Sequence, residues 1–230
     1  MTLYGVELVV ADDPEQVASI VADELNEAAR AGRAIALTGG RSPGRAYQLA
    51  AEREPNWSKA SLWWGDERCV PPDDDRSNYK LARENLLDRL EVQPREVRRI
   101  RGELGAEAAA EEYDALLLDV RLGLVLLGLG PDGHTASLFP NAPTLEDRER
   151  RAVPAEAGLE PFVDRVTMTV PVLSSAPEVL FIVTGAEKAE ATERAFAHPP
   201  DPATPASLIR SIGGTTRVVA DRAAASRLQH

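Results

Sequence analysis

Two patterns of apolar residues alternate along the chain, and each predicts a different kind of element. Short, nearly continuous apolar runs are typical of strands buried on both faces of a parallel sheet. They predict strands at Gly5–Val10, Ala34–Leu37, Ser61–Trp64, Gly123–Leu127, Val166–Val170, Val179–Val183 and Arg217–Ala220. Longer segments with one apolar helical face predict helices at Pro14–Ala31, Pro43–Glu52, Ser77–Leu90, Ala106–Asp119, Ala186–Ala197 and Thr204–Ile212.

This alternation of strands and helices predicts an α/β fold with right-handed crossovers and a mostly parallel sheet flanked by helices. Asp13 and Ser42 precede prolines at two predicted helix starts, where they suit the capping position. Asp66–Arg76 and Pro140–Asp164 are the long irregular stretches. No repeat or linker divides the chain, so we expect residues 1–230 to form a single domain.

Composition narrows the classes of partner. No apolar run approaches the roughly 18–20 residues that cross a bilayer, so we expect no membrane contact. The chain starts without the basic segment of a secretory signal, and a lone cysteine cannot build a disulfide framework, which together favour the cytoplasm. The net charge of −11 argues against nucleic acid but not against a small phosphate ester. An acidic surface is compatible with a monomer.

The segment Thr38–Gly44, TGGRSPG, follows a predicted strand and precedes a predicted helix. The glycines Gly39 and Gly40 allow a tight turn with exposed N–H groups, and a helix N-terminus favours anions. Such a turn suits a phosphate, with Ser42 donating its hydroxyl and Arg41 adding charge. An ordinary strand-to-helix turn capped by Ser42 fits the spacing equally well.

The segment that begins GDER also follows a predicted strand, where open α/β sheets bind ligands. Asp66 is a candidate for binding substrate, and Arg68 for holding an anion or an oxyanion. The alternative is a structural Asp66–Arg68 pair, with Ser77 only capping the next helix. Asp73–Asp75 has the composition of a metal loop, but adjacent loop carboxylates are usually only solvated. Cys69 has no histidine nearby in sequence, so we interpret it as a packing residue.

The segment LGLGPDGHTASLFP, residues 127–140, contains a formal G-x-G-x-x-G match. Its mid-chain position, the interrupting Pro131 and the lack of a following acidic strand end argue against a dinucleotide turn. We expect the glycines to clear space while Asp132, His134 and Thr135 project from the start of a short helix. His134 is the outstanding candidate for a general base near neutral pH. Asp132 orients His134 or caps the helix.

A fourth segment, GAEKA, again follows a predicted strand. Lys188 lies in the first helical turn, where the helix dipole disfavours a cation, and this hints at an anionic ligand. A single exposed lysine is a common alternative. Arg165, just before the predicted strand VTMTV, is a further candidate for the same role.

Taken together and in this order, GGRSP, GDER with SN, GLGPDGHTASLFP, RVTMTVPVL and GAEKA resemble the 6-phosphogluconolactonases of the pentose phosphate pathway. The resemblance covers nearly the whole chain, and DGHTASLFP is its most specific part. The family belongs to a wider group with glucosamine-6-phosphate deaminases and isomerases, which share a Rossmann-like parallel sheet. The resemblance implies no metal and no nucleotide cofactor.

The resemblance implies hydrolysis of 6-phosphoglucono-1,5-lactone. His134 would take a proton from water, Arg68 would stabilise the oxyanion or orient the substrate, and Asp132 would orient His134. The phosphate would be anchored by Gly39 and Gly40, Ser42, Lys188 and Arg165. Many members read Gly-Gly-Ser-Thr-Pro in the phosphate turn, so Arg41 is a departure that either adds a cation or points away.

Three rival functions differ in what the sequence offers them. Deaminases of the group carry a glutamate where this chain has Phe139, and the loss of that acid argues against amine removal and isomerisation. A sugar-phosphate sensor would normally append a DNA-binding helix-turn-helix, for which we expect no room here. A dehydrogenase would need the glycines of residues 128–133 to bind a nicotinamide cofactor.

Overall fold

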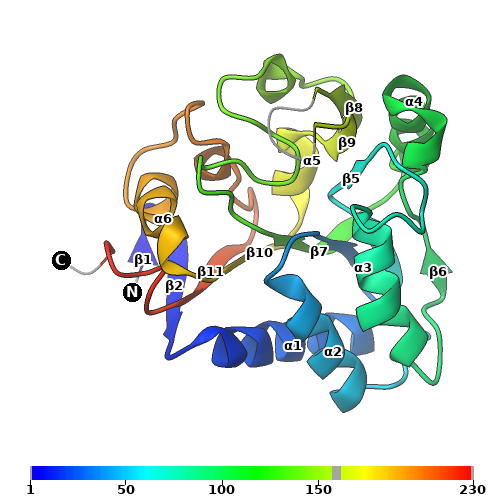
Figure 1. Cartoon of the computed structure of the whole chain (residues 1–230), viewed down its shortest axis with the longest axis horizontal. Helices are drawn as coiled ribbons and strands as arrows, with labels where there is room; N and C mark the ends of the chain where they lie inside the picture. The colour runs from blue at the N-terminus through cyan, green and yellow to red at the C-terminus, as the bar shows by residue number, and fades with distance from the viewer. Residues whose placement is uncertain (1, 157–161, 229–230) are drawn as a thin grey trace.

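The computed structural model describes residues 2–156 and 162–228, and it has two sheets with helices around them (Figure 1). The strands are β1 Thr2–Leu3, β2 Val6–Ala11, β3 Ala34–Leu37, β4 Ser61–Trp64, β5 Asp66–Arg68, β6 Glu96–Val97, β7 Leu122–Leu127, β8 Ala152–Ala155, β9 Arg165–Met168, β10 Glu178–Val183 and β11 Thr215–Asp221. The helices are α1 Pro14–Arg30, α2 Pro43–Arg53, α3 Asn78–Asn85, α4 Ala106–Leu116, α5 Val170–Ser175 and α6 Ala189–Phe196.

The large sheet has the strand order β1-β2-β11-β10-β7-β3-β4-β6. Every neighbouring pair from β2 to β6 is parallel, and β1 adds an antiparallel edge. The chain runs outward from β3 to β4 on one side, whereas β7 continues to β10 on the other. This change of direction between β3 and β7 is where doubly wound sheets open a crevice for a ligand. The predicted α/β fold with a mostly parallel sheet is confirmed.

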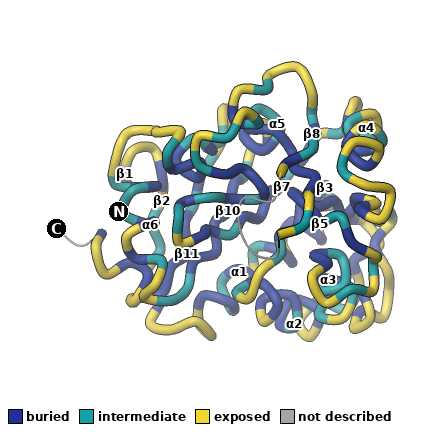
Figure 2. The backbone as a smooth tube through the Cα atoms, turned by 45° about the horizontal axis from the view of Figure 1, so that its top comes forward, coloured by how far each residue is buried: buried dark blue, intermediate teal, exposed yellow. Residues whose placement is uncertain are grey.

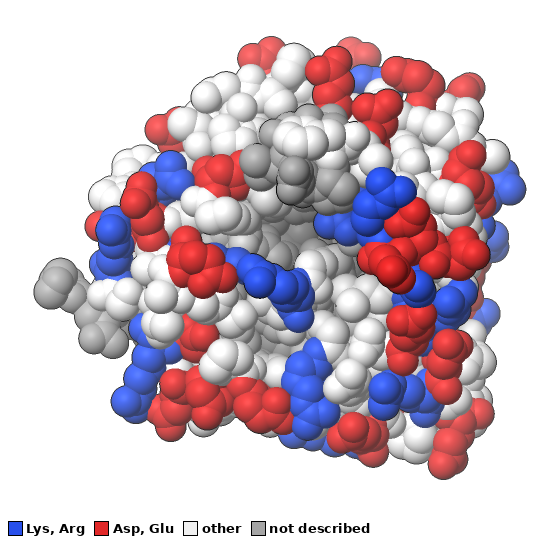
Figure 3. Space-filling view, in the orientation of Figure 1, with Lys and Arg blue, Asp and Glu red and all other residues white. Residues whose placement is uncertain are grey.

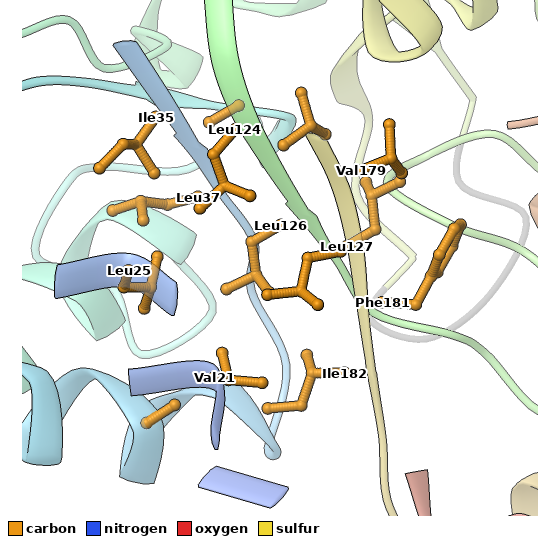
Figure 4. Close-up of a cluster of buried hydrophobic side chains, with 14 of the residues drawn as sticks. Val21, Leu25, Ile35, Leu37, Leu124, Leu126, Leu127, Val179, Phe181 and Ile182 are labelled. Carbon is orange, nitrogen blue, oxygen red and sulfur yellow. The ribbon is translucent and has the colours of Figure 1, made fainter. Parts of the chain in front are cut away.

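The core of the large sheet lies on both of its faces. Figure 4 shows Val21 and Leu25 of α1 facing Leu37, Leu126 and Ile182 of three neighbouring strands, and all five side chains are fully buried. Because side chains alternate along a strand, the next residues point to the opposite face. There Phe181 of β10 packs edge-on against Phe196 of α6, with ring centroids 5.0 Å apart.

Burial is greatest in the strands, while the outer loops are exposed (Figure 2). All four residues of β4 are buried, as are residues 124–127 of β7. These continuous apolar strands are buried on both faces, which is the pattern expected of a parallel sheet covered by helices. In the described ranges 2–156 and 162–228, no helix has the length and apolar character needed to span a bilayer.

A second sheet, with the order β5-β9-β8, corrects one prediction about the strands. We expected a strand at Val166–Val170 in the main sheet, but β9 forms the middle of this antiparallel sheet and ends at Met168. Val170 and Pro171 start helix α5, because proline suits the first turn of a helix and cannot donate to a sheet. Pro154 is tolerated in β8 because that strand is an edge.

Both predicted irregular stretches contribute an edge strand to this sheet. Asp66–Arg76 begins with β5, and Pro140–Asp164 contains β8, although residues 157–161 of that stretch lie outside the described residues. The small sheet pairs Arg68 with Arg165, so it joins two candidate site residues that are almost one hundred positions apart in the chain.

Several predicted helices are shorter than expected. Ser77–Leu90 is α3 followed by a 3₁₀ turn at Leu87–Arg89, and Ala186–Ala197 is a 3₁₀ turn at Ala186–Lys188 followed by α6. Thr204–Ile212 contains only a 3₁₀ turn, Pro205–Leu208. There the Ser207 hydroxyl bonds both the N–H and the C=O of Asp201, and such local bonds compete with helix formation. Asp13 does cap α1, by accepting from the N–H of Gln16.

Candidate functional site

The four candidate segments follow the carboxyl ends of four adjacent parallel strands. Residues 38–44 follow β3, residues 65–68 follow β4, residues 128–140 follow β7, and residues 184–188 follow β10. These strands are neighbours in the order β10-β7-β3-β4. Parallel strands end at the same edge of a sheet, so segments 150 residues apart in the chain converge there. The edge includes the change of direction between β3 and β7.

A cleft at this edge gathers six of the predicted site residues. Its lining is Thr38, Gly39, Gly40, Asp66, Arg68, Asn78, Gly128, His134, Thr135, Ala136 and Arg165. Figure 3 shows this face of the molecule hollowed near its centre, with Lys and Arg side chains at the edges of the hollow and many acidic side chains toward the periphery. The acidic net charge is therefore compatible with a basic cleft.

The turn after β3 is held by a buried tyrosine. The Tyr47 hydroxyl, from α2, accepts from the N–H of Thr38 at 3.0 Å and donates to the C=O of Thr38 at 2.7 Å. Gly40 follows with a φ of +97°, a conformation that a residue with a side chain rarely adopts. Tyr47 therefore fixes the end of β3, and Gly40 allows the backbone to turn into the cleft.

Two predictions about this turn meet a different geometry. Ser42 does not cap α2 with its side chain; its hydroxyl lies 2.7 Å from the Thr184 hydroxyl, which belongs to the segment after β10. The Arg41 side chain is 95% exposed and lies 3.8 Å from the carboxylate of Glu187. Thus Ser42 joins the first segment to the fourth, and Arg41 is not among the residues that line the cleft.

The loop after β7 is a series of tight turns, so the prediction that Asp132, His134 and Thr135 project from the start of a short helix is wrong. Gly133 has a φ of +96° and donates its N–H to the C=O of Gly130. The N–H of Gly130 donates to the C=O of His134. A Cβ atom on Gly130 would lie 2.0 Å from Nδ1 of His134. Gly130 therefore makes the room in which the His134 ring lies. Without a helix after these glycines, the dinucleotide interpretation loses its phosphate-binding helix start.

His134 and Asp132 form a close pair. Oδ1 of Asp132 lies 2.5 Å from Nδ1 of His134 and also accepts from the N–H of His134 at 3.2 Å. Since an ionised carboxylate only accepts, Nδ1 carries the proton and Nε2 is left with a free lone pair. Burial would raise the pKa of Asp132, but the hydrogen bond and the charge attraction of His134 outweigh it and lower that pKa. Asp132 therefore stays ionised and orients the ring.

Asp66 is buried and fully engaged. Its Oδ2 accepts from the Ser137 hydroxyl at 2.7 Å and its Oδ1 from the Asn78 amide at 3.1 Å. No ion pair joins Asp66 to Arg68 in the part of the chain that the structure describes, so the structural pair that we considered does not form. Ser77 does cap α3, by accepting from the N–H of Lys80.

Glu67, which the sequence did not single out, is buried and anchors the start of α3. Its carboxylate accepts from the Ser77 hydroxyl at 3.0 Å and from the N–H groups of Asn78 at 2.7 Å and Tyr79 at 2.8 Å. A carboxylate at a helix N-terminus satisfies N–H groups that have no partner within the helix. Glu67 thereby fixes α3 against β5, the strand that ends with Arg68.

Arg68 and Arg165 face each other across the pair β5–β9. Arg68 donates to the C=O of Arg76 at 2.5 Å. Arg165 is 3% exposed and lies over the Phe139 ring, 5.4 Å from its centroid. Burial and then the nearby charge of Arg68 lower the pKa of Arg165. Two neighbouring cations beside a cleft can bind an anion or stabilise developing negative charge.

Lys188 lies beside the cleft rather than in its lining. It ends the 3₁₀ turn Ala186–Lys188 and directly precedes α6. Its side chain forms no ion pair with any residue in the described ranges. Burial is the main cause that lowers the pKa of Lys188. The attraction of Glu187 opposes this by raising the pKa, and the repulsion of Arg41 lowers it further. The Ser42–Thr184 hydrogen bond holds its segment next to the glycine turn.

The remaining candidates from the sequence serve the structure. Asp74 pairs with Arg76 at 2.7 Å and Asp75 with Lys80 at 2.5 Å, at the surface. Burial raises the pKa of the Cys69 thiol to about 11, which is consistent with a packing residue. Across residues 2–156 and 162–228, no group of three or more His, Cys, Asp or Glu side chains is arranged to hold a metal ion.

Comparison with known proteins shows which family the chain belongs to. The family model described as glucosamine-6-phosphate isomerases/6-phosphogluconolactonase matches residues 12–218. Human 6-phosphogluconolactonase is 38% identical over 212 residues, covering 87% of this chain and 82% of the human protein. Probable 6-phosphogluconolactonase 1 of Arabidopsis thaliana is 35% identical over 204 residues, covering 80% of this chain and 76% of that protein.

A solved structure of a 6-phosphogluconolactonase is also similar to this chain. The structure of 6-phosphogluconolactonase from Trypanosoma brucei has a TM-score of 0.86 to this chain at 26% identity, covering 97% of this chain and 99% of that one. The matched segment 12–218 includes every residue of the cleft described above. The chain therefore belongs to the family of glucosamine-6-phosphate isomerases and 6-phosphogluconolactonases.

Proposed function

We propose that this protein hydrolyses 6-phosphoglucono-1,5-lactone to 6-phosphogluconate, the lactone step of the pentose phosphate pathway. The observation that carries the proposal is the His134–Asp132 pair, which opens onto a cleft lined also by a glycine turn and two arginines. That arrangement combines a base, an anion site and a site for an oxyanion. The names of the human and Arabidopsis relatives support the same activity.

His134 acts as the general base in this proposal. Its Nε2 takes a proton from water, and the resulting hydroxide attacks the lactone carbonyl carbon. The tetrahedral intermediate collapses by breaking the bond to the ring oxygen, which receives the proton back from His134. One water is thus added across the ester bond. Asp132 holds the ring with Nε2 free and stabilises the imidazolium that forms between the two steps.

The groups that bind negative charge lie at two ends of the proposed substrate, the phosphate and the lactone carbonyl. The N–H groups of the turn at Gly39 and Gly40, together with Lys188, anchor the phosphate. Arg68 stabilises the oxyanion. We expected Arg165 to help with the phosphate, but its position beside Arg68 favours a shared role at the carbonyl end. The engagement of Ser42 with Thr184 favours a role in holding the phosphate site together over direct contact.

The alternative activity of the family, amine release from glucosamine 6-phosphate, has less support. Phe139 occupies the position where the deaminases carry a glutamate, and its ring packs 5.2 Å from the His134 ring. Among the described residues that line the cleft, the one carboxylate is Asp66, and both of its oxygens already accept hydrogen bonds. Neither residue supplies a free acid for opening a sugar ring.

A paired assay tests the proposal. Glucose 6-phosphate dehydrogenase generates the lactone, and the disappearance of the lactone is followed with and without the protein. The measurement without the protein gives the rate of unaided hydrolysis. In parallel, glucosamine 6-phosphate is supplied and ammonia is measured. We expect accelerated hydrolysis and no ammonia; ammonia without faster hydrolysis would overturn the proposal.

We further propose that residues 1–230 work as a single domain, as a monomer in the cytoplasm.

A further inference from the structure

We propose that Asn78 is a positioning residue. It fixes the turn at residues 38–44, called here the phosphate-binding turn, relative to the loop of His134. This inference rests on the proposed lactone hydrolysis and extends it to a residue to which neither the sequence nor the family resemblance gave a role. Asn78 is the first residue of α3, is 1% exposed and lines the cleft without projecting a charge into it. Its side chain contacts Asp66 in the segment after β4 and Gly39 in the segment after β3. Through Asp66 it is linked to Ser137 in the segment after β7.

The amide of Asn78 has one orientation only. Its Nδ2 donates to the backbone C=O of Asp66 at 2.9 Å and to Oδ1 of Asp66 at 3.1 Å. Both partners are acceptors, so the NH₂ group must face them and Oδ1 must point the other way. The backbone N–H of Asn78 is itself held by Glu67 at 2.7 Å. The direction of Oδ1 is therefore fixed by β5.

Oδ1 of Asn78 lies against Gly39 in the phosphate-binding turn. A Cβ atom on Gly39 would lie 1.7 Å from this oxygen, so the Gly39 Cα and Oδ1 are in direct contact. Contacts of this kind between a Cα–H group and an oxygen are weakly attractive. The contact also explains why this position is a glycine although its φ is not positive. Asn78 therefore sets how closely the turn approaches β5.

From Asp66 the chain of contacts continues to the loop of His134. Oδ2 of Asp66 accepts from the Ser137 hydroxyl at 2.7 Å, three residues after His134. Asp66 and Ser137 are both buried, so the links are shielded from water. The path Gly39–Asn78–Asp66–Ser137 thus joins the end of the site that takes the phosphate to the end that holds the base. A misplacement of about 1 Å between such groups lowers a rate about 10²-fold.

Two variants separate positioning from a general contribution to folding. Asn78→Ala removes both contacts, and we expect kcat to fall about 10- to 100-fold while the Kd for 6-phosphogluconate changes less than about threefold. Asn78→Asp keeps an oxygen against Gly39 but puts a carboxylate against Asp66. Two carboxylates in contact share a proton, which raises the pKa of one of them.

The pH dependence of Asn78→Asp is the discriminating measurement. As the pH falls, the shared proton restores a donor between positions 78 and 66, so the ratio of variant to wild-type kcat should rise toward one between about pH 8 and 5. The titratable and charged groups around this contact are Tyr47, Glu67, Arg68, His134 and Arg165. All of them are present in both proteins, so the ratio removes their common titration.

The matched control is Asn85→Ala, on the same helix but bonded to Gln48 and Leu81 outside the cleft. We expect its kcat and its pH profile to match the wild type, with Tm recorded for every variant. The inference is overturned if the Asn78→Asp ratio is flat with pH, or if Asn78→Ala loses affinity and kcat in parallel. If Asn78→Ala does not fold, the Asn78→Asp ratio decides. Failure of the proposed function is distinct: the wild type itself would then not accelerate lactone hydrolysis.

Discussion

The carboxylate of Asp132 holds His134 at two points, at ring Nδ1 over 2.5 Å and at the backbone N–H over 3.2 Å. Two contacts from one oxygen fix both the loop and the ring that it carries. Because the carboxylate can only accept, this geometry also selects the imidazole tautomer with Nε2 unprotonated. The proposed general base is therefore oriented before substrate binds.

Replacing Asp132 with Asn tests this relationship. The amide is nearly the same size, but its NH₂ group can donate to Nδ1 and so stabilise the wrong tautomer. We expect kcat to fall about 10²-fold or more, with KM nearly unchanged. Steady-state kinetics of lactone hydrolysis provide the measurement. Unchanged kcat would mean that Asp132 serves only the loop.

Gly130→Ala tests the space around the same ring. The new methyl group would lie 2.0 Å from Nδ1 of His134 and 2.7 Å from Oδ1 of Asp132, so the pair must separate. We expect kcat to fall by about the 10²–10⁴-fold that general base catalysis contributes. Gly213→Ala is the control, because a Cβ there meets nothing within 4 Å. Equal loss in both variants would argue against a specific effect on His134.

The placement of these segments could be predicted from the sequence because the strands before them are plain. Continuous apolar runs mark β3, β4, β7 and β10, and parallel strands end at one edge. A motif after each run is therefore expected to face the same crevice. The family resemblance assigned His134, Arg68 and Gly39 to one site, and the shared edge of the sheet is the physical reason that they meet.

What the sequence could not predict depends on such contacts. The Ser42 hydroxyl meets Thr184, 142 positions away, so its orientation is invisible in the local pattern. Strand β5 is only three residues long and polar, and it forms a strand only because β9 pairs with it. Asn78 matters through Gly39 and Asp66 in three dimensions, although its SN motif was part of the family resemblance.

Lys188 gives a prediction about pH. Only the protonated amine attracts a phosphate, and burial lowers the pKa of Lys188 below the usual range of a lysine. Raising the pH through this lowered pKa removes the charge, so the affinity for 6-phosphogluconate should decline in a pH range where an exposed lysine is still charged. Calorimetric titrations between pH 8 and 10 measure this, above the second phosphate ionisation near pH 6.

The matched variant is Lys188→Met, which removes the charge at every pH. We expect its KM for the lactone to be about tenfold higher than that of the wild type, and its affinity for 6-phosphogluconate to be independent of pH over the same range. An unchanged KM would place the phosphate anchor elsewhere. A persisting decline of affinity with pH in the variant would assign that titration to another group.

Tyr47→Phe tests how the turn after β3, which we propose binds the phosphate, is built. Removing the hydroxyl leaves the buried N–H and C=O of Thr38 without their partner, which should lower the free energy of unfolding by about 1–3 kcal/mol. Urea unfolding measures the change. Tyr79→Phe is the control, since no hydrogen bond joins its hydroxyl to a described residue, and we expect a change within about 0.5 kcal/mol. Similar losses in both would contradict the assigned role of Tyr47.

The central claim is that His134 is the base that activates water, and His134→Ala tests it most directly. The lactone is generated from glucose 6-phosphate, and hydrolysis by wild type and variant is compared after subtracting the uncatalysed rate. We predict that kcat falls about 10²–10⁴-fold while Tm and the affinity for 6-phosphogluconate are retained. A kcat within a factor of about two of the wild type would contradict the account.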